Sequence, residues 1–201
     1  MGTSTQPDGV GSAVPQALAT SERILVAAAE MTAEIGWAGV TMAALAERVG
    51  VSRQTVYNEW GNRDRLAEAM VLRELGAFLD QVDAGFDAHP SDLWAGTQAA
   101  IDNVLDLART NPLLRAIVTA THGAETELVP LLTTRADVVI VVASERVRDR
   151  LMSYQGVRLA DLEVTVDLLV RTVLSHVMQP SARDESVPAT LGAAVARLLI
   201  D

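Results

Sequence analysis

Apolar residues recur every three or four positions through most of this 201-residue sequence, from about residue 21 to its end. This is the period of an α-helix that buries one face. No segment alternates apolar and polar residues strictly over several positions, as a half-buried strand would. The run 138–142 contains only Val and Ile and could form a strand, but its flanks continue at helical spacing. We therefore predict an all-α protein of about nine helices.

The composition excludes several kinds of site. Cysteine is absent and all 16 basic residues are Arg, which excludes disulfides, thiolate nucleophiles and the lysine of phosphate loops and Schiff bases. No apolar run reaches the roughly 18 residues that a membrane span needs. The segment 1–21 has no basic residue, which argues against a secretory signal. We expect a cytoplasmic protein with no cofactor and no membrane partner.

Helix-breaking and capping residues divide the chain. Residues 1–20 are rich in Gly, Pro, Ser and Thr without a periodic pattern, so we predict a flexible arm. Gly36, Gly50 and Gly61 then separate a first helix, two short helices and a long helix. Beyond residue 62, the helices are expected at 63–85, 91–110, 124–155, 161–179 and 188–200, with a short one after the Asn111-Pro112 break.

The segment 41–60 has the pattern of a helix-turn-helix. Thr41 and Ser52 are suited to cap its two short helices, and Gly50 supplies the tight turn between them. The second helix keeps Val56 inside. Its other side chains suit the edges of bases in a major groove, where Gln and Asn bond adenine, Arg bonds guanine and Thr contacts thymine. These exposed residues are Arg53, Gln54, Thr55, Tyr57 and Asn58.

Residues 40–66, VTMAALAERVGVSRQTVYNEWGNRDRL, resemble the DNA-binding signature of the TetR (tetracycline repressor) family of bacterial regulators almost position by position. The preceding turn, Gly36-Trp37-x-Gly39, also matches, so that the resemblance covers about residues 21–75. Two positions depart from the family pattern, which usually has Phe in place of Trp60 and Lys in place of Arg63. Trp can fill the same core position, and Arg keeps the positive charge.

The resemblance implies a helix-turn-helix DNA-binding domain over 21–67 and a ligand-binding and dimerisation domain over 68–201. Within the first domain it implies that Thr41, Tyr57 and Arg63 bond backbone phosphates and that Ser52 is shared between its cap and a phosphate. Phosphate contacts set the position of such a protein on DNA, whereas base contacts set the sequence that it reads. The residues implied to face bases are Arg53, Gln54, Thr55 and Asn58.

The charge balance is compatible with this interpretation. The whole chain has a formal charge of −10, which opposes unspecific DNA binding. The segment 48–65 nevertheless has four Arg against two acidic residues, and charge near the groove dominates within a Debye length of about 8 Å.

The resemblance also implies a ligand chamber among the C-terminal helices. The candidate lining is mostly apolar, which suggests a largely apolar effector of unknown identity. Arg171 is the charged exception: it could bind a ligand carboxylate, or form an i,i+4 pair with Asp167, which we favour. The candidate residues are Phe78, Trp94, Ile101, Leu105, Met152, Arg171 and Met178.

A homodimer made by the last two helices is a further implication, because an operator read by one short helix needs a symmetric partner. Both helices have apolar residues at three-to-four spacing, which is equally typical of ordinary core helices within one chain. The candidate interface residues are Val166, Leu169, Val170, Val173, Val177, Leu191, Val195 and Leu198.

The sequence offers little for an enzyme. His89, His122 and His176 have no metal-site spacing, so we expect no metal site. Asp102 and Asp106 share a helix face, but Arg109 lies nearby and surface charge is the better interpretation.

We predict a homodimeric repressor that binds a palindromic operator in double-stranded DNA and is released by a small ligand. The alternative is a helical adaptor or small-molecule-binding protein that does not bind DNA.

Overall fold

The computed structural model describes residues 19–115, 136–180 and 186–200. These residues are mainly helical and contain no strand, so the predicted all-α class is confirmed. Residues 1–18 of the arm predicted over 1–20, the end of the short helix after Asn111, and His122 lie outside the described residues. The helices are α1 (Thr20–Gly39), α2 (Met42–Val49), α3 (Arg53–Trp60), α4 (Arg63–Asp87), α5 (Leu93–Thr110), α8 (Ala136–Met152), α9 (Leu159–Met178) and α10 (Val187–Leu199).

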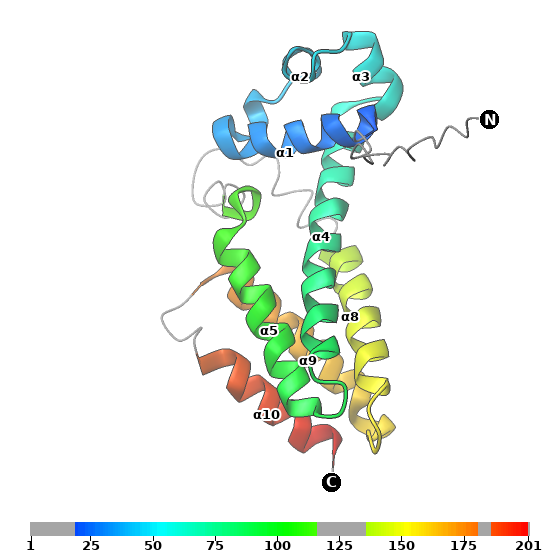
Figure 1. Cartoon of the computed structure of the whole chain (residues 1–201), viewed down its shortest axis with the longest axis vertical. Helices are drawn as coiled ribbons and strands as arrows, with labels where there is room; N and C mark the ends of the chain where they lie inside the picture. The colour runs from blue at the N-terminus through cyan, green and yellow to red at the C-terminus, as the bar shows by residue number, and fades with distance from the viewer. Residues whose placement is uncertain (1–18, 116–135, 181–185, 201) are drawn as a thin grey trace, which may run out of the picture.

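The first three helices and the start of α4 pack around one hydrophobic cluster, at the top of Figure 1. Ile24 of α1, Leu45 of α2, Val56 of α3 and Leu66 of α4 are all completely buried in it. Each helix thus contributes the apolar face that its three-to-four spacing predicted. Burial of such a side chain stabilises a fold by about 1.5–3 kcal/mol.

The turn between α2 and α3 has the geometry that its residues favour. Gly50 has a φ of 74°, in the left-handed region that suits glycine. The backbone N–H groups of Gly50 and Val51 both donate to the carbonyl of Ala46, which closes the end of α2. Arg23 of α1 donates a 2.6 Å hydrogen bond to the carbonyl of Val49, which connects the C-terminal end of α2 to α1.

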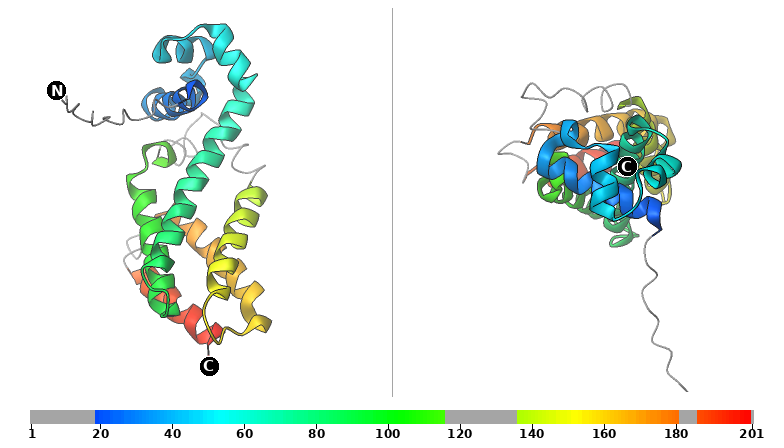
Figure 2. Two further views of the ribbon diagram at one scale, coloured as in Figure 1. Left: turned by 45° about the vertical axis from the view of Figure 1, so that its right-hand side comes forward. Right: turned by 90° about the horizontal axis from the view of Figure 1, so that it is seen from above.

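Helix α4 connects the two parts of the molecule. It begins in the N-terminal cluster and runs down beside α5 and α8, as the left view of Figure 2 shows. Gly85 of α4 packs directly on the backbone of Ala100 in α5, where a Cβ atom would come within 2.2 Å of the Ala100 nitrogen. A second hydrophobic cluster is formed by α4, α5, α8, α9 and α10.

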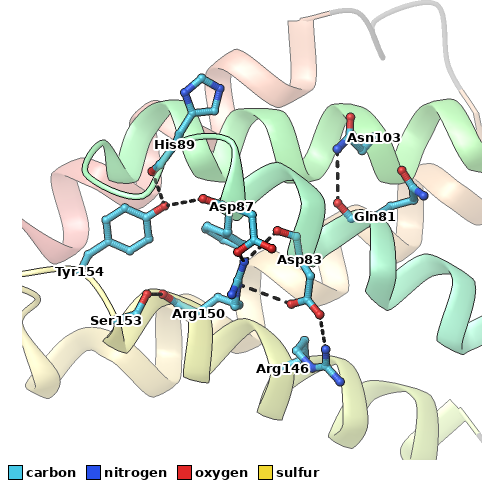
Figure 3. A network of polar contacts seen from close by, with 10 residues as sticks. Gln81, Asp83, Asp87, His89, Asn103, Arg146, Arg150, Ser153 and Tyr154 are labelled. Carbon is cyan, nitrogen blue, oxygen red and sulfur yellow. Dashed lines mark hydrogen bonds and ion pairs between the residues drawn. The ribbon is translucent and has the colours of Figure 1, made fainter.

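A polar network joins the last turns of α4 to α8 (Figure 3). Arg146 and Arg150 of α8 both form ion pairs with Asp83, and Arg150 also pairs with Asp87. The hydroxyl of Tyr154 donates a 2.7 Å hydrogen bond to the carbonyl of His89. The lower end of α4 is therefore fixed to α8 by charge as well as by packing.

Helices α9 and α10 lie within two residues of their predicted ranges, whereas α8 ends at Met152 and not at residue 155. Residues 124–135 of that predicted helix lie outside the described residues. The run 138–142 is part of α8, which excludes the strand alternative. The backbone N–H of Arg158, before α9, donates to the carbonyl of Leu199 in α10 at 2.8 Å and joins these two helices at one end. Among the described helices, none is long and apolar enough to cross a membrane.

Candidate DNA-binding surface and effector cavity

Helix α3 turns one side inward and leaves the rest exposed. Val56 is its one buried residue, at 0% exposure. Arg53, Gln54, Tyr57 and Asn58 are exposed, and half of the Tyr57 surface is accessible. Thr55 is partly buried. A helix of two turns with this arrangement can enter a major groove while its apolar side stays on the domain.

The predicted caps are present at both short helices. The Thr41 side chain accepts a hydrogen bond from the backbone N–H of Ala44 at 3.1 Å. Ser52 Oγ accepts from the N–H of Thr55 at 3.0 Å and lies 2.8 Å from the Thr55 hydroxyl. These bonds use the cap oxygens and leave the hydroxyl hydrogen of Thr41 available to a phosphate.

Two of the predicted base-reading residues are bonded to each other in the DNA-free protein. Gln54 Nε2 donates a 2.8 Å hydrogen bond to Asn58 Oδ1, one helical turn further on. Both side chains are exposed, so this bond exchanges readily with water. It holds the two amides on one face of α3, where they can bond neighbouring bases.

Arg63 has an internal role that the sequence did not indicate. Its guanidinium lies over the Trp37 ring, 4.5 Å from the ring centroid, and donates to the Trp37 carbonyl. Arg63 is partly buried there, whereas Arg65 is exposed. The guanidinium that the family resemblance assigned to a phosphate therefore joins the start of α4 to the last turn of α1. Arg can do this because its planar group stacks on an aromatic ring.

The positive charge near the recognition helix is smaller than the sequence count indicated. Arg48 forms a two-point hydrogen bond with Glu34 of α1 and lies 3.8 Å from Glu30. The hydrogen bonds from Arg48 lower the pKa of Glu34 below its usual range, so that this carboxylate stays charged. Arg48 is itself exposed but paired with these acidic residues, whereas Arg53 and Arg65 are exposed cations of the segment 48–65 outside this pairing.

Trp60 shows the consequence of one departure from the family pattern. The residue is partly buried against the N-terminal cluster, as Phe would be. Its indole N–H is buried without a hydrogen-bond partner among the described residues. The larger ring therefore fills the position and adds an unsatisfied donor, which opposes part of its packing gain.

A cavity of about 190 Å³ lies in the second cluster. Its walls come from α4, α5, α8 and α9, and from Asn111, Leu113 and Leu114. Nearly all the lining side chains are apolar. Phe78 and Val82 of α4, Ile101 of α5 and Val173 of α9 are typical of them. Such a cavity favours an apolar ligand that fills it closely.

Three of the seven predicted lining residues are on the cavity wall: Phe78, Ile101 and Met178. The other four lie outside the lining of this cavity. Trp94 is exposed on α5 and packs against Gly192 of α10, and Met152 is exposed at the end of α8. Leu105 is buried in the second cluster outside the lining. Arg171 is exposed and its Nε lies 2.8 Å from Asp167 Oδ1, which confirms the i,i+4 pair.

The polar residues of the cavity were not predicted. Glu74, Asn111 and Thr97 belong to its lining. Asn111 had been interpreted only as a helix break, and Glu74 and Thr97 occupy positions that an apolar stripe does not include. A search for polar residues one helical turn from the stripe would have found them.

The predicted dimer residues face mainly inward. Four of them, Leu169, Val170, Val173 and Val177, line the cavity of their own chain. Helical periodicity identifies the most apolar face, and α9 packs on α5, α8 and α10 of its own chain. Val166 and Val195 are buried in the second cluster, Leu191 is partly buried against it, and Leu198 is exposed.

A different apolar surface is exposed on the last two helices. Val164 and Leu168 lie one turn apart on the outer face of α9, with 65% and 55% of their surfaces accessible. Leu159 and Leu198 are exposed where α9 meets α10. We call these four residues the outer α9–α10 surface.

Among the described residues, the Asp and His side chains that were considered for catalysis or a metal site do not form a common cluster. Asp106 pairs with Arg109 in an exposed i,i+3 ion pair, which agrees with the surface-charge interpretation. His89 is exposed in the turn before α5, and His176 is partly buried on α9.

Comparison with known proteins agrees with this arrangement. Residues 24–70 match the model of bacterial regulatory proteins of the tetR family, and residues 92–197 match the C-terminal domain of the bacterial Tetracyclin repressor. The HTH-type transcriptional regulator AlkX of Mycobacterium tuberculosis is 30% identical over 156 residues, which cover 77% of this chain and 73% of the relative.

Solved structures share the fold. The TetR family repressor AlkX of a Dietzia strain, implicated in biodegradation of n-alkanes, has a TM-score of 0.70 at 24% identity, with 88% of this chain and 98% of that chain covered. A TetR-family regulator from Streptomyces coelicolor has a TM-score of 0.62 at 23% identity, with 90% and 100% covered.

The N-terminal helix-turn-helix and the C-terminal helical bundle together define a DNA-binding transcriptional regulator with a ligand-binding domain. The chain belongs to the TetR family of bacterial regulatory proteins. Proteins of this family are regulators of transcription and typically not enzymes.

Proposed function

We propose that this protein is a homodimeric repressor of the bacterial cytoplasm, released from a palindromic operator by an apolar small molecule. The observation that carries the proposal is the continuity of α4, which begins beside the recognition helix and ends as a wall of the cavity. A ligand that displaces α4 changes the separation of the two recognition helices. That separation must stay near one duplex turn, about 34 Å, for both to enter adjacent major grooves.

The second copy of the chain is proposed to dock on the outer α9–α10 surface. Its four apolar side chains are exposed in the single chain, and their burial in a dimer would stabilise the association. The symmetry of a two-fold dimer matches the symmetry of a palindromic site.

An aliphatic effector is favoured by the lining of the cavity. The Dietzia repressor is implicated in biodegradation of n-alkanes, and the apolar wall of this cavity suits an aliphatic molecule. The ligand releases DNA only to the extent that it prefers the conformation with widely spaced recognition helices.

Selection of bound sequences from a random duplex pool tests the proposal. We expect an enriched palindrome with half-sites about one helical turn apart. If no sequence is enriched at low salt, the adaptor without DNA binding becomes the better interpretation. Decane added to the complex with the selected duplex then tests release, read as a fall in fluorescence anisotropy.

Two variants separate the proposed roles on α3. Gln54→Ala is expected to relax base preference by about 1–3 kcal/mol at one position of each half-site. Tyr57→Phe is expected to weaken binding to all duplexes evenly, because it removes a phosphate contact. Equal, sequence-independent losses from both variants would contradict the base-reading role of Gln54.

A further inference from the structure

Gln54 and Asn58 form a pair on the exposed face of the recognition helix α3. They lie one turn apart, and Gln54 Nε2 donates a 2.8 Å hydrogen bond to Asn58 Oδ1. Neither side chain bonds any other group among the described residues. The second hydrogen on Gln54 Nε2 and the Gln54 Oε1 atom are therefore available to a base in the groove.

The hydrogen-bonding pattern of Gln54 depends on whether its amide is paired. An unpaired amide has two N–H donors, one on the side of its oxygen and one on the opposite side. Adenine offers an acceptor, N7, beside a donor, N6, whereas guanine offers two acceptors, N7 and O6. An unpaired Gln54 can therefore match adenine with Oε1 and one N–H, or guanine with its two N–H groups.

The bond to Asn58 removes the match to guanine. One N–H of Gln54 is engaged by Asn58 Oδ1, so that one donor and one acceptor remain for a base. This pattern matches N7 and N6 of adenine. With guanine it places Oε1 against O6, and both oxygen atoms are then left without a donor.

The same bond fixes which way the Gln54 amide is turned. The last torsion of a Gln side chain is broad and roughly two-fold, so an unpaired amide can adopt either orientation. Because Asn58 Oδ1 accepts from Nε2, the Gln54 nitrogen lies toward Asn58 and Oε1 lies on the other side. Water competes for this bond in the free protein, and contact with the base edges displaces that water.

We propose that Asn58 is a positioning residue, which restricts Gln54 to adenine and reads no base of its own. This rests on the proposed base-reading role of Gln54 in the repressor. It gives Asn58 a different role from the direct base contact that the family resemblance implied. Loss of the Asn58 acceptor then allows Gln54 to accept guanine at the same base pair.

Competition binding of the full-length protein tests the assignment, with the selected operator and with duplexes that carry single base-pair replacements in both half-sites. Gln54→Ala identifies the base pair that Gln54 reads, and we expect adenine there. Asn58→Ala is expected to lower the preference for adenine over guanine at that same base pair about fivefold, the equivalent of one neutral hydrogen bond. Adding Asn58→Ala to Gln54→Ala should change nothing further at that base pair, because the two side chains act as a unit.

Asn58→Asp separates positioning from base reading. Its carboxylate keeps an acceptor for Gln54 Nε2 and loses the donors with which Asn58 itself would read adenine. We expect this variant to keep the native preference for adenine and to bind all duplexes more weakly, because it places a negative charge near the phosphates. Glu59→Ala, which shortens the neighbouring exposed side chain of α3, is the matched control and should keep the native preference.

The variants can contradict the inference in several ways. A base other than adenine at the Gln54 position, or an unchanged preference in Asn58→Ala, would overturn it. A preference in Asn58→Asp as relaxed as in Asn58→Ala would do the same. Relaxation by Asn58→Ala at a different base pair from Gln54→Ala would show that Asn58 reads a base of its own. Circular dichroism of each variant checks that its helix content is native.

The selection experiment distinguishes this inference from the proposed function. Enrichment of no operator would overturn the repressor and, with it, any base-reading role on α3. An enriched palindrome whose adenine preference Asn58→Ala leaves intact would overturn the positioning role alone.

Discussion

The side-chain amide of Asn111 donates a 2.6 Å hydrogen bond to Glu74 Oε2 and so ties the end of α5 to the middle of α4. The neighbouring Arg73 Nε donates at 3.0 Å to Glu22, in the first turn of α1. These two bonds connect one end of the cavity with the first helix of the DNA-binding part. A displacement of α4 near Glu74 therefore disturbs its contact with the end of α5 at the cavity and its contact with α1 in the DNA-binding part.

The first prediction concerns this bond. Asn111→Ala is expected to lower the free energy of unfolding by about 1–3 kcal/mol, because it removes a hydrogen bond to a carboxylate and the cap on the N–H of Leu114. Urea unfolding followed by circular dichroism measures the change.

Asn103→Ala is its control. Asn103 is also on α5 and donates one 3.3 Å hydrogen bond to the carbonyl of Gln81. This single neutral bond is expected to contribute about 0.5–1.5 kcal/mol. A loss in Asn103→Ala equal to that in Asn111→Ala would show that the Glu74 contact adds nothing.

Arg63 gives the second prediction. Arg63→Lys keeps the charge but loses the planar group over Trp37, so the free energy of unfolding is expected to fall by about 0.5–2 kcal/mol. Arg65→Lys, at an exposed position two residues on, is expected to leave stability unchanged. Thermal unfolding of the native protein, Arg63→Lys and Arg65→Lys measures both changes in stability.

The salt dependence of DNA binding tests the role that the family resemblance assigned to Arg63. We expect Arg63→Ala to leave the slope of log K against log salt unchanged, since the guanidinium is engaged with Trp37. A slope that falls by about 0.9 per contact would instead establish a phosphate contact.

The sequence predicted most reliably what depends on neighbouring residues. Thr41 and Ser52 cap their helices and Gly50 adopts a positive φ, because each of these features is decided within a few positions of the chain. The i,i+4 pair of Arg171 with Asp167 is local in the same sense.

Features that depend on tertiary packing were predicted less well. Periodicity identified the apolar face of α9 but could not say whether a second copy or the same chain covers it. Val173 therefore appeared as an interface residue although it lines the cavity. Trp94 and Met152 were expected inside because they are large and apolar, yet their helices turn them outward. Nothing in the spacing indicated that Arg63 would stack on Trp37.

The third prediction concerns the outer α9–α10 surface. Leu168→Glu is expected to convert the dimer to a monomer, because it places a charge within the proposed apolar contact. The fold of the single chain should persist, since Leu168 is more than half exposed. Sedimentation velocity gives the mass in solution, and circular dichroism gives the helix content.

Val141→Glu controls for a charge placed on any exposed apolar position. Val141 is 53% exposed on α8, away from the outer α9–α10 surface. This variant is expected to stay dimeric. Dissociation by Val141→Glu, or a stable dimer of Leu168→Glu, would move the interface away from the face proposed here.

Tyr154 gives the last prediction. Burial raises the pKa of its phenol above the usual value of about 10. The chain has only two tyrosines, so the phenolate absorbance of a Tyr57→Phe protein reports Tyr154 alone. We expect this absorbance to develop at higher pH in the folded protein than in urea.

The same shift predicts how stability depends on pH. The folded protein holds the phenol proton more tightly than the unfolded chain does, so the contribution of Tyr154 is fully present below pH about 10 and is lost as the pH rises through the raised pKa. In the Tyr57→Phe background, the urea midpoint should therefore decline above pH 10. Adding Tyr154→Phe should lower the midpoint at neutral pH, since the bond to the His89 carbonyl is lost, but should flatten the alkaline decline. An equally steep decline in both proteins would mean that another group causes it.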